Sequence, residues 1–238
     1  LRALMLIALV VFVAAAIQGV LGFGGALIAM PLLVALVGVQ TATPAFALIG
    51  TLAALLNAIR WRAHVTLGDL VQLVIPAALG IPIGVLFLAR VDSAIVTRTL
   101  GVNLILYAAY NLLGWAVPPL RHRIWAIAAG FSSGILNGAF NTGGPPVILF
   151  ANARGWTADR FRGNLQTYFL LTSFFTLTSH ALTGHFTPVV WRTALIGMPA
   201  PLVGQLLGVR LCRYLNPDSF RRLVLVFLLL LGAQLLIF

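Results

Sequence analysis

Two glycine-rich segments interrupt apolar stretches of the sequence, and their composition suits the binding of a small anion. They are Gly22-Phe23-Gly24-Gly25 and Asn141-Thr142-Gly143-Gly144. A Gly–Gly step lets the backbone unwind and admits close approach of another group. The helix that follows each segment would begin with free N–H groups and about half a positive charge. Two such helix starts that face each other would bind an anion without a buried cation.

Each break also has a structural alternative, because small residues let two membrane helices pack closely. We favour the binding hypothesis because the break occurs twice, with polar Asn141 and Thr142 in the second copy. Four amide side chains near the breaks could donate to an oxyanion while staying neutral: Gln18, Asn57, Asn137 and Gln166. Hydrogen bonding between helices is their alternative role, since an unpaired amide in hydrocarbon is costly.

Two ionisable side chains could act on an anion or a proton. Arg162 follows the second break and could guide an anion with its guanidinium fork, or it could anchor the chain at the membrane surface. His180 lies deep in an apolar stretch, where it could carry a proton or pack as a neutral, hydrogen-bonded ring. The carboxylates lie in connections or at helix starts and suit N-capping: Asp69, Asp92, Asp159 and Asp218. Because no His, Glu or Cys cluster is present, we expect no metal site and no cofactor.

The elements that carry these residues must lie in a membrane. Of the 238 residues, 61% are hydrophobic and 8% are charged, whereas an ordinary soluble domain has about 25% charged residues. A spanning helix takes roughly 20 apolar residues, which leaves room for about eight to ten crossings. The net charge of +11 comes from arginines scattered among short connections. This pattern indicates topology signals and not a nucleic-acid surface.

Ten apolar segments form an internal repeat at an offset of about 119 to 124 residues. They are 3–18, 25–38, 43–59, 69–89, 97–116, 123–140, 144–153, 163–182, 189–209 and 220–238. Aligned positions include Gly19 with Gly138, His64 with His185, Gly80 with Gly204, and Gly84 with Gly208. The second and seventh segments are too short to cross comfortably. We therefore predict an all-α membrane protein of two repeated halves, 1–118 and 119–238, each with one short broken or re-entrant helix.

The two halves could be inverted or parallel. If the short segments cross the bilayer, each half has five spans, the halves are inverted, and eleven of the fifteen arginines share one face. If each short segment joins its predecessor in one broken helix, the halves are parallel and the split is nine to six. The positive-inside rule favours the inverted arrangement.

The motif Gly22-Phe23-Gly24-Gly25 followed by Met30-Pro31, with its second copy Asn141-Thr142-Gly143-Gly144-Pro145, resembles the sulfite exporter TauE/SafE family of membrane permeases. The resemblance extends over nearly the whole chain, to the arginine-rich stretch 216–222. It implies export, or less often uptake, of sulfite or small organosulfur anions such as sulfoacetate, with coupling to the proton-motive force. The second copy departs from the first in having Phe150 where Pro31 falls, so the two broken helices need not be equivalent.

We expect a secondary transporter that exports small sulfur-containing anions across the cell inner membrane by alternating access. The anion would lie between the Gly24-Gly25 and Gly143-Gly144 steps. A passive anion channel of similar architecture is the alternative, and a non-transporting membrane subunit is a third hypothesis. An enzyme is not expected, because the sequence has neither a catalytic cluster nor a Walker lysine. The expected partners are the anion, membrane lipid and coupling protons, and nucleic acid is not among them.

Overall fold

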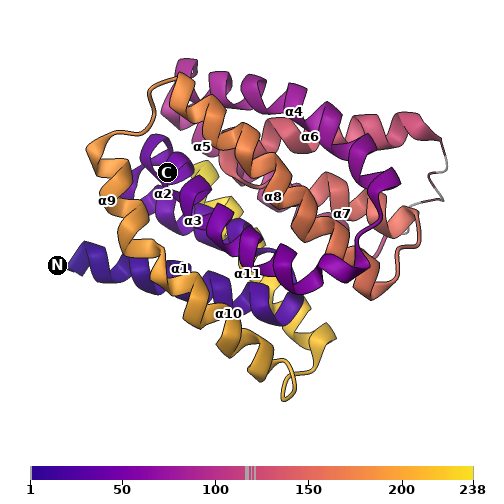
Figure 1. Cartoon of the computed structure of the whole chain (residues 1–238). Coiled ribbons are helices and arrows are strands. Elements are labelled where there is room, and N and C mark those ends of the chain that lie inside the picture. Colours follow the sequence, from indigo (N-terminus) through magenta and orange to yellow (C-terminus); the bar gives the residue numbers. More distant parts are fainter. Residues whose placement is uncertain (1, 116–117, 119, 121, 238) are drawn as a thin grey trace. The chain divides into compact units, whose positions relative to one another are not determined.

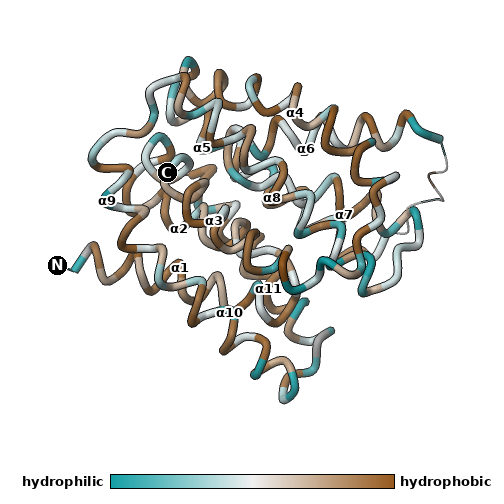
Figure 2. Tube along the Cα trace, viewed as in Figure 1, coloured by the Kyte–Doolittle hydropathy of each residue, from teal (hydrophilic) through white to brown (hydrophobic). Residues whose placement is uncertain are grey.

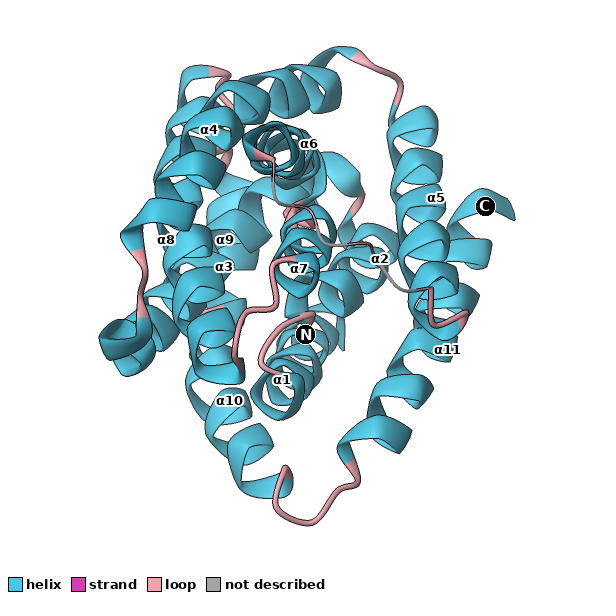
Figure 3. Ribbon diagram, turned by 90° about the vertical axis from the view of Figure 1, so that its right-hand side faces the viewer, coloured by secondary structure: helices cyan, strands magenta, loops and turns pink. Residues whose placement is uncertain are grey.

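The computed structural model describes residues 2–115, 118, 120 and 122–237, and within them every regular element is a helix (Figure 3). The helices are α1 Arg2–Leu21, α2 Gly25–Val37, α3 Val39–Trp61, η1 Arg62–His64, α4 Leu67–Arg90, α5 Ser93–Leu112, α6 Arg123–Phe140, α7 Gly144–Ala153, α8 Ala158–Leu182, α9 Pro188–Gly197, α10 Pro199–Leu211 and α11 Pro217–Ile237. The predicted all-α class is therefore confirmed (Figure 1). Arg121, which contributes to the predicted charge asymmetry, and residue 119, where the second half would begin, lie outside the described residues.

Five helical segments of the described chain are long and apolar enough to cross a membrane. They are Leu4–Leu21, Val39–His64, Leu67–Arg90, Pro188–Leu211 and Asp218–Ile237. Apolar residues follow the helices, and polar residues gather at the connections (Figure 2). Many large apolar side chains point outward, and Leu79 and Leu195 are 67% and 62% exposed. Such surfaces suit contact with lipid. The chain is a membrane protein, and its count of eight to ten crossings stays a prediction.

The chain divides into two compact units. Unit 1 comprises Leu1–Ile49, Val91–Trp115 and Thr187–Phe238, and unit 2 comprises Gly50–Arg90 and Ala116–Phe186. Helix α3 contributes to both units, because the division falls between Ile49 and Gly50. Each unit contains helices from both predicted halves of the sequence.

Unit 1 is built on close backbone contact between α1 and α10, and α11 packs against α5. A Cβ atom added to Gly204 would lie 2.6 Å from the Phe12 carbonyl oxygen. A Cβ atom on Gly208 would meet the Ala16 carbonyl oxygen closer than 3.0 Å, and one on Gly19 would lie 2.6 Å from the Gln205 carbonyl oxygen. Glycine at these positions lets the two helix backbones touch.

Unit 2 repeats this kind of contact between α4 and α6, and α8 packs against α4. A Cβ atom on Gly80 or Gly84 would meet the carbonyl oxygen of Phe131 or Ile135 closer than 3.0 Å. A Cβ atom on Gly138 would meet the Ile81 carbonyl oxygen equally closely. The backbones of α4 and α6 therefore approach each other through small residues on both helices.

Candidate functional site

In unit 1 the first glycine-rich segment separates α1 from α2, as the sequence predicts. Gly22 and Gly24 have φ angles of 81° and 91°, which favour glycine strongly. The Gly22 N–H donates to the Gln18 carbonyl oxygen at 2.7 Å, and α2 begins at Gly25. A Cβ atom on Gly25 would collide with Oε1 of Gln18. The Gln18 side chain therefore lies against the first residue of α2, and these residues form one cluster.

In unit 2 the second segment separates α6 from α7. Asn141 is the non-glycine residue with positive φ in the described chain, at 55°, and its N–H donates to the Asn137 carbonyl oxygen at 2.8 Å. The predicted repeat aligns Asn141 with Gly22, and both residues have positive φ angles. Gly143, aligned with Gly24, has a φ of −68° instead. The two breaks therefore differ in backbone geometry. The helices that follow them also differ in sequence, since Phe150 stands at the position aligned with Pro31.

Two residues that the sequence analysis did not select hold the second break in place. Ser133 on α6 donates through Oγ to the Gly143 carbonyl oxygen, and Tyr168 on α8 donates its hydroxyl proton to Ser133 Oγ at 2.7 Å. Both side chains are fully buried. Because Ser133 binds Gly143 and is itself bound by Tyr168 from α8, this chain of hydrogen bonds fixes the start of α7 within unit 2.

Asn137 forms the second tie between α6 and α8. Its Nδ2 donates to Thr176 Oγ1 at 2.9 Å, and the Thr176 hydroxyl donates in turn to the Thr172 carbonyl oxygen at 3.0 Å. Thr176 belongs to a row of polar side chains at every fourth residue of α8, each at most 1% exposed: Asn164, Tyr168, Thr172, Thr176 and His180. Residues four apart share one helix face, so this spacing is a signal by which the sequence could have revealed the row.

The tie from Tyr168 can be tested by substitution. Tyr168→Phe removes the proton donated to the buried Ser133 oxygen, which should cost about 1 kcal/mol of folding free energy and lower the melting temperature by about 2–4 °C. Tyr110→Phe is the control, because the Tyr110 hydroxyl donates to the Trp115 carbonyl oxygen at an exposed site. Thermal unfolding in detergent measures both shifts, and equal shifts would contradict the structural role given to Tyr168.

Gly143 and Gly144 differ in the space around them. A Cβ atom on Gly143 would lie 2.7 Å from the Ser133 carbonyl oxygen and 2.9 Å from Asn137 Cβ. A Cβ atom on Gly144 would lie 3.5 Å from both Ile148 and Phe169, which is an ordinary contact. Only Gly143 therefore requires the absence of a side chain for steric reasons.

The remaining predicted site residues of unit 2 lie at several places. Asn57 is half-buried on α3, and Gln166 is 3% exposed on α8. Arg162 lies over the Trp61 ring at 5.1 Å and 3.8 Å from Asp159, so its guanidinium already has an aromatic and an acidic neighbour. Its role as an anion guide stays a prediction.

The carboxylates follow the N-capping prediction in part. Asp92 caps α5 by accepting from the Ala94 N–H at 2.8 Å. Asp69 has another role: it accepts from Arg160 at 2.6 Å and from the Trp156 ring N–H at 2.8 Å, and so ties α4 to α8. The contact with Arg160 could not be predicted from spacing, because 91 residues separate the partners.

Apolar helices of spanning length, with helix breaks at paired glycine-rich segments, define the class as an all-helical membrane protein. The family model described as Sulfite exporter TauE/SafE matches residues 7–235. The chain therefore belongs to the TauE/SafE sulfite exporter family. No curated protein and no solved structure matches it. This is a family of membrane transporters, and membership in it implies a membrane transporter of sulfur anions such as sulfite.

Proposed function

We propose that the protein is a secondary transporter that exports sulfite or small organosulfonates such as sulfoacetate across the cell inner membrane by alternating access. The observation that carries this proposal is the pair of helix breaks in a chain of this family. Each break places a new helix start after a glycine-rich turn, and helix starts attract anions. Corresponding interrupted helices in two halves of a transporter are typical of substrate sites.

The two helix starts differ in the groups that each would offer to an anion. In the first turn of α2, Gly25, Ala26 and Leu27 all have N–H groups without partners in their own helix. In α7 only Gly144 offers such a group, because the next two residues are Pro145 and Pro146. The second half would therefore rely more on side-chain amides, from Asn137, Asn141 and Gln166, with Thr142 beside them. In the first half Gln18 lies against Gly25, so its amide would bind an anion together with the N–H groups of α2.

Alternating access would follow from two inverted halves, 1–118 and 119–238, with eight to ten crossings. Recurring contacts support this part of the proposal. Gly204 lies against the Phe12 carbonyl oxygen, and its aligned partner Gly80 lies against that of Phe131, 119 residues after Phe12. Gly208 and Gly84 likewise lie against Ala16 and Ile135, which are also 119 residues apart. Halves of equal construction could exchange conformations, which is the basis of alternating access in repeat-built transporters.

Sulfite counterflow in proteoliposomes tests the proposal. Vesicles are loaded with unlabelled sulfite, diluted into labelled sulfite under anaerobic conditions, and compared with protein-free vesicles. A carrier accumulates label transiently and saturates with sulfite concentration. A passive channel, the alternative function, lets label only equilibrate and shows no saturation. A non-transporting subunit gives no flux above that of empty vesicles. Repeating the assay with sulfoacetate, taurine and sulfate in the loading solution ranks the substrates.

A further inference from the structure

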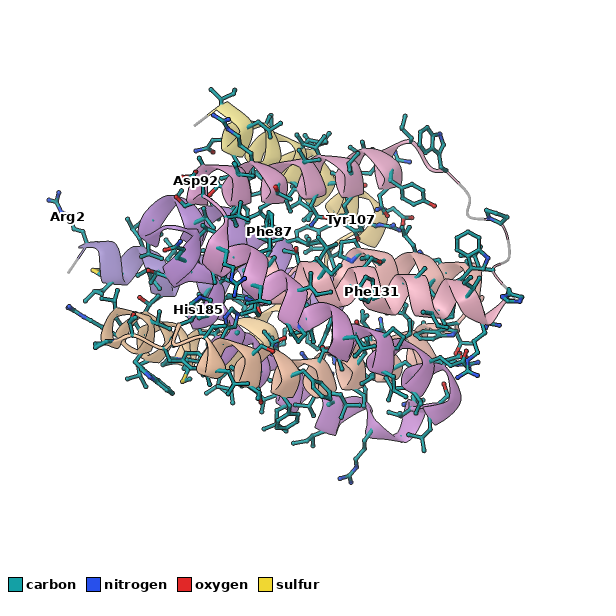
Figure 4. All side chains as sticks on the ribbon, turned by 90° about the horizontal axis from the view of Figure 1, so that it is seen from above. Arg2, Phe87, Asp92, Tyr107, Phe131 and His185 are labelled. Atoms are coloured by element: carbon teal, nitrogen blue, oxygen red, sulfur yellow. The ribbon has the colours of Figure 1, made fainter. Side chains whose placement is uncertain are left out.

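Two imidazole rings face each other at the C-terminal end of α8. Nδ1 of His180 lies 2.8 Å from Nδ1 of His185, which is labelled in Figure 4. His180 is fully buried, whereas His185 is half-buried in the connection after Leu182, where α8 ends. At this distance one of the two nitrogens must donate a proton and the other must accept it.

The contacts of Thr183 are compatible with one particular arrangement of the protons. The Thr183 hydroxyl has one proton, and backbone carbonyl oxygens of Ser179 and His180 accept it at 2.9 and 3.2 Å. Its oxygen lies 3.1 Å from His185 Nδ1, which donates to it when that ring carries its proton on Nδ1. In this tautomer the same N–H also points to His180 Nδ1, which accepts. His180 then carries its own proton on Nε2.

This arrangement has room for one further proton. If both Nδ1 atoms carried a proton, two N–H groups would confront each other across 2.8 Å. In this tautomer the added proton goes to Nε2 of His185, and burial favours the same choice, because a charge costs less on this half-buried ring than on fully buried His180. His180 then stays neutral and accepts from the imidazolium, and a charge-assisted hydrogen bond holds the cation. Among the described residues, no acceptor lies within hydrogen-bonding distance of His180 Nε2.

We propose that the His180–His185 pair is the proton-binding site of the transporter, and that one proton is taken up and released there in each transport cycle. The proposal rests on the proposed function. It assigns the coupling ion, and it assigns the proton to His185, with His180 as the residue that positions it.

The pair is connected to the second break through α8. His180 lies one helical turn after Thr176, which accepts the hydrogen bond from Asn137. Asn137 in turn packs against Gly143, since a Cβ atom there would lie 2.9 Å from Asn137 Cβ. A positive charge on the pair therefore arises one turn from Thr176, whose partner Asn137 lies beside Gly143.

Other ionisable groups on the elements packed against α8 in unit 2 are Arg62 and His64 on η1, Asp69 and Arg90 on α4, Arg123 on α6, and none on α7 itself. Asp69 is bound by Arg160, which lies about 20 residues and so roughly 30 Å from His180 along α8.

Burial lowers the pKa of His185. The pair therefore stays neutral at neutral pH and is loaded only from an acidic side.

The lowered pKa of His185 also predicts a dependence of stability on pH. The unfolded chain, with an ordinary histidine pKa of about 6.5, binds a proton more readily than the folded chain does. The contribution of neutral His185 to folding stability is therefore complete above about pH 6.5, and it is lost as the pH is lowered through the pKa of the folded chain. Melting temperatures measured between neutral and mildly acidic pH should drop more for the natural protein than for His185→Gln, and equal drops would contradict this assignment.

The repeat offers a matched control. His64 aligns with His185, but Ile59 stands at the position aligned with His180, so the first half has no imidazole pair. His64 instead packs beside the Trp61 ring at 5.9 Å. His64→Gln therefore removes one imidazole from the equivalent connection without touching the pair.

Two assays on the same proteoliposomes test the proposal. Sulfite counterflow needs no net proton movement, and it reports the proposed function alone. Accumulation of labelled sulfite against its gradient, driven by an imposed pH gradient in either polarity, reports proton coupling. We expect His185→Gln and His180→Gln to retain counterflow and lose pH-driven accumulation at least tenfold, while His64→Gln retains both.

If accumulation driven by a pH gradient survives in both pair variants, the proposal is overturned. The same holds if the natural protein performs counterflow but never responds to a pH gradient. In that case the proposed function would stand without this coupling site. Absence of counterflow in the natural protein would overturn both the proposed function and the proton-binding site. Nitrogen-15 NMR of labelled histidines gives an independent check: His180 should stay neutral and protonated on Nε2 while His185 titrates, and titration of His180 would overturn the assignment.

Discussion

Gly143→Ala is expected to reduce sulfite counterflow about a hundredfold, whereas Gly144→Ala, one residue further, should change it less than about threefold. The added methyl group on Gly143 would lie 2.7 Å from the Ser133 carbonyl oxygen and 2.9 Å from Ser133 Oγ, so the start of α7 must move. Misplacing a binding group by about 1 Å typically costs on the order of a hundredfold in activity. On Gly144 the same methyl group makes only ordinary contacts at 3.5 Å.

Counterflow should be normalised to the amount of folded protein, since overpacking at Gly143 also costs about 1–3 kcal/mol of stability. Size-exclusion chromatography and thermal unfolding of both variants supply that correction. If Gly143→Ala and Gly144→Ala retain equal counterflow per amount of folded protein, the second break does not contribute to the anion site.

Gly84→Ala and Gly208→Ala are expected to reduce the yield of folded protein strongly. Each methyl group would meet a backbone carbonyl oxygen closer than 3.0 Å, that of Ile135 in unit 2 and that of Ala16 in unit 1. A backbone atom cannot swing aside as a side chain can, so the helix pair must separate along its length. Dense packing makes such separation costly.

Gly68→Ala is the control for this pair, because a Cβ atom there has no neighbour within 4 Å and lies in the first turn of α4. Alanine should be neutral or stabilising there by up to about 1 kcal/mol. The fraction of monodisperse protein after detergent extraction gives the comparison. Matching losses for Gly84→Ala and Gly208→Ala agree with the proposed repeat, and a loss no greater than that of Gly68→Ala would argue against close helix contact at these positions.

The helix breaks could be predicted from the sequence because their cause is local. Glycine at Gly22 and Gly24 permits positive φ, and an apolar stretch that resumes after the Gly–Gly step predicts a new helix at Gly25 or Gly144. The membrane class followed from composition for a similar reason. Local conformational preference and hydropathy are properties of a few residues, and they do not depend on the rest of the fold.

The tertiary hydrogen bonds that hold the second break in place could not be predicted from local sequence. Tyr168 and Ser133 are separated by 35 residues, and nothing in either segment indicates which face of α6 meets which face of α8. The polar row on α8 was visible as a four-residue spacing, but its partners depend on tertiary packing. The His180–His185 contact escaped prediction because it depends on the turn through Thr183 and Gly184, where Gly184 has a φ of 71°.

Anomalous diffraction can locate the bound anion and so show whether it lies at the helix breaks. Selenite, the selenium analogue of sulfite, can be soaked into crystals of the protein and located by anomalous diffraction from selenium. We expect a selenium peak within hydrogen-bonding distance of first-turn N–H groups of α2 or of Gly144 in α7, and its loss in Gly143→Ala crystals. A selenium peak far from both breaks, in a protein that performs sulfite counterflow, would show that the anion does not bind at the helix starts.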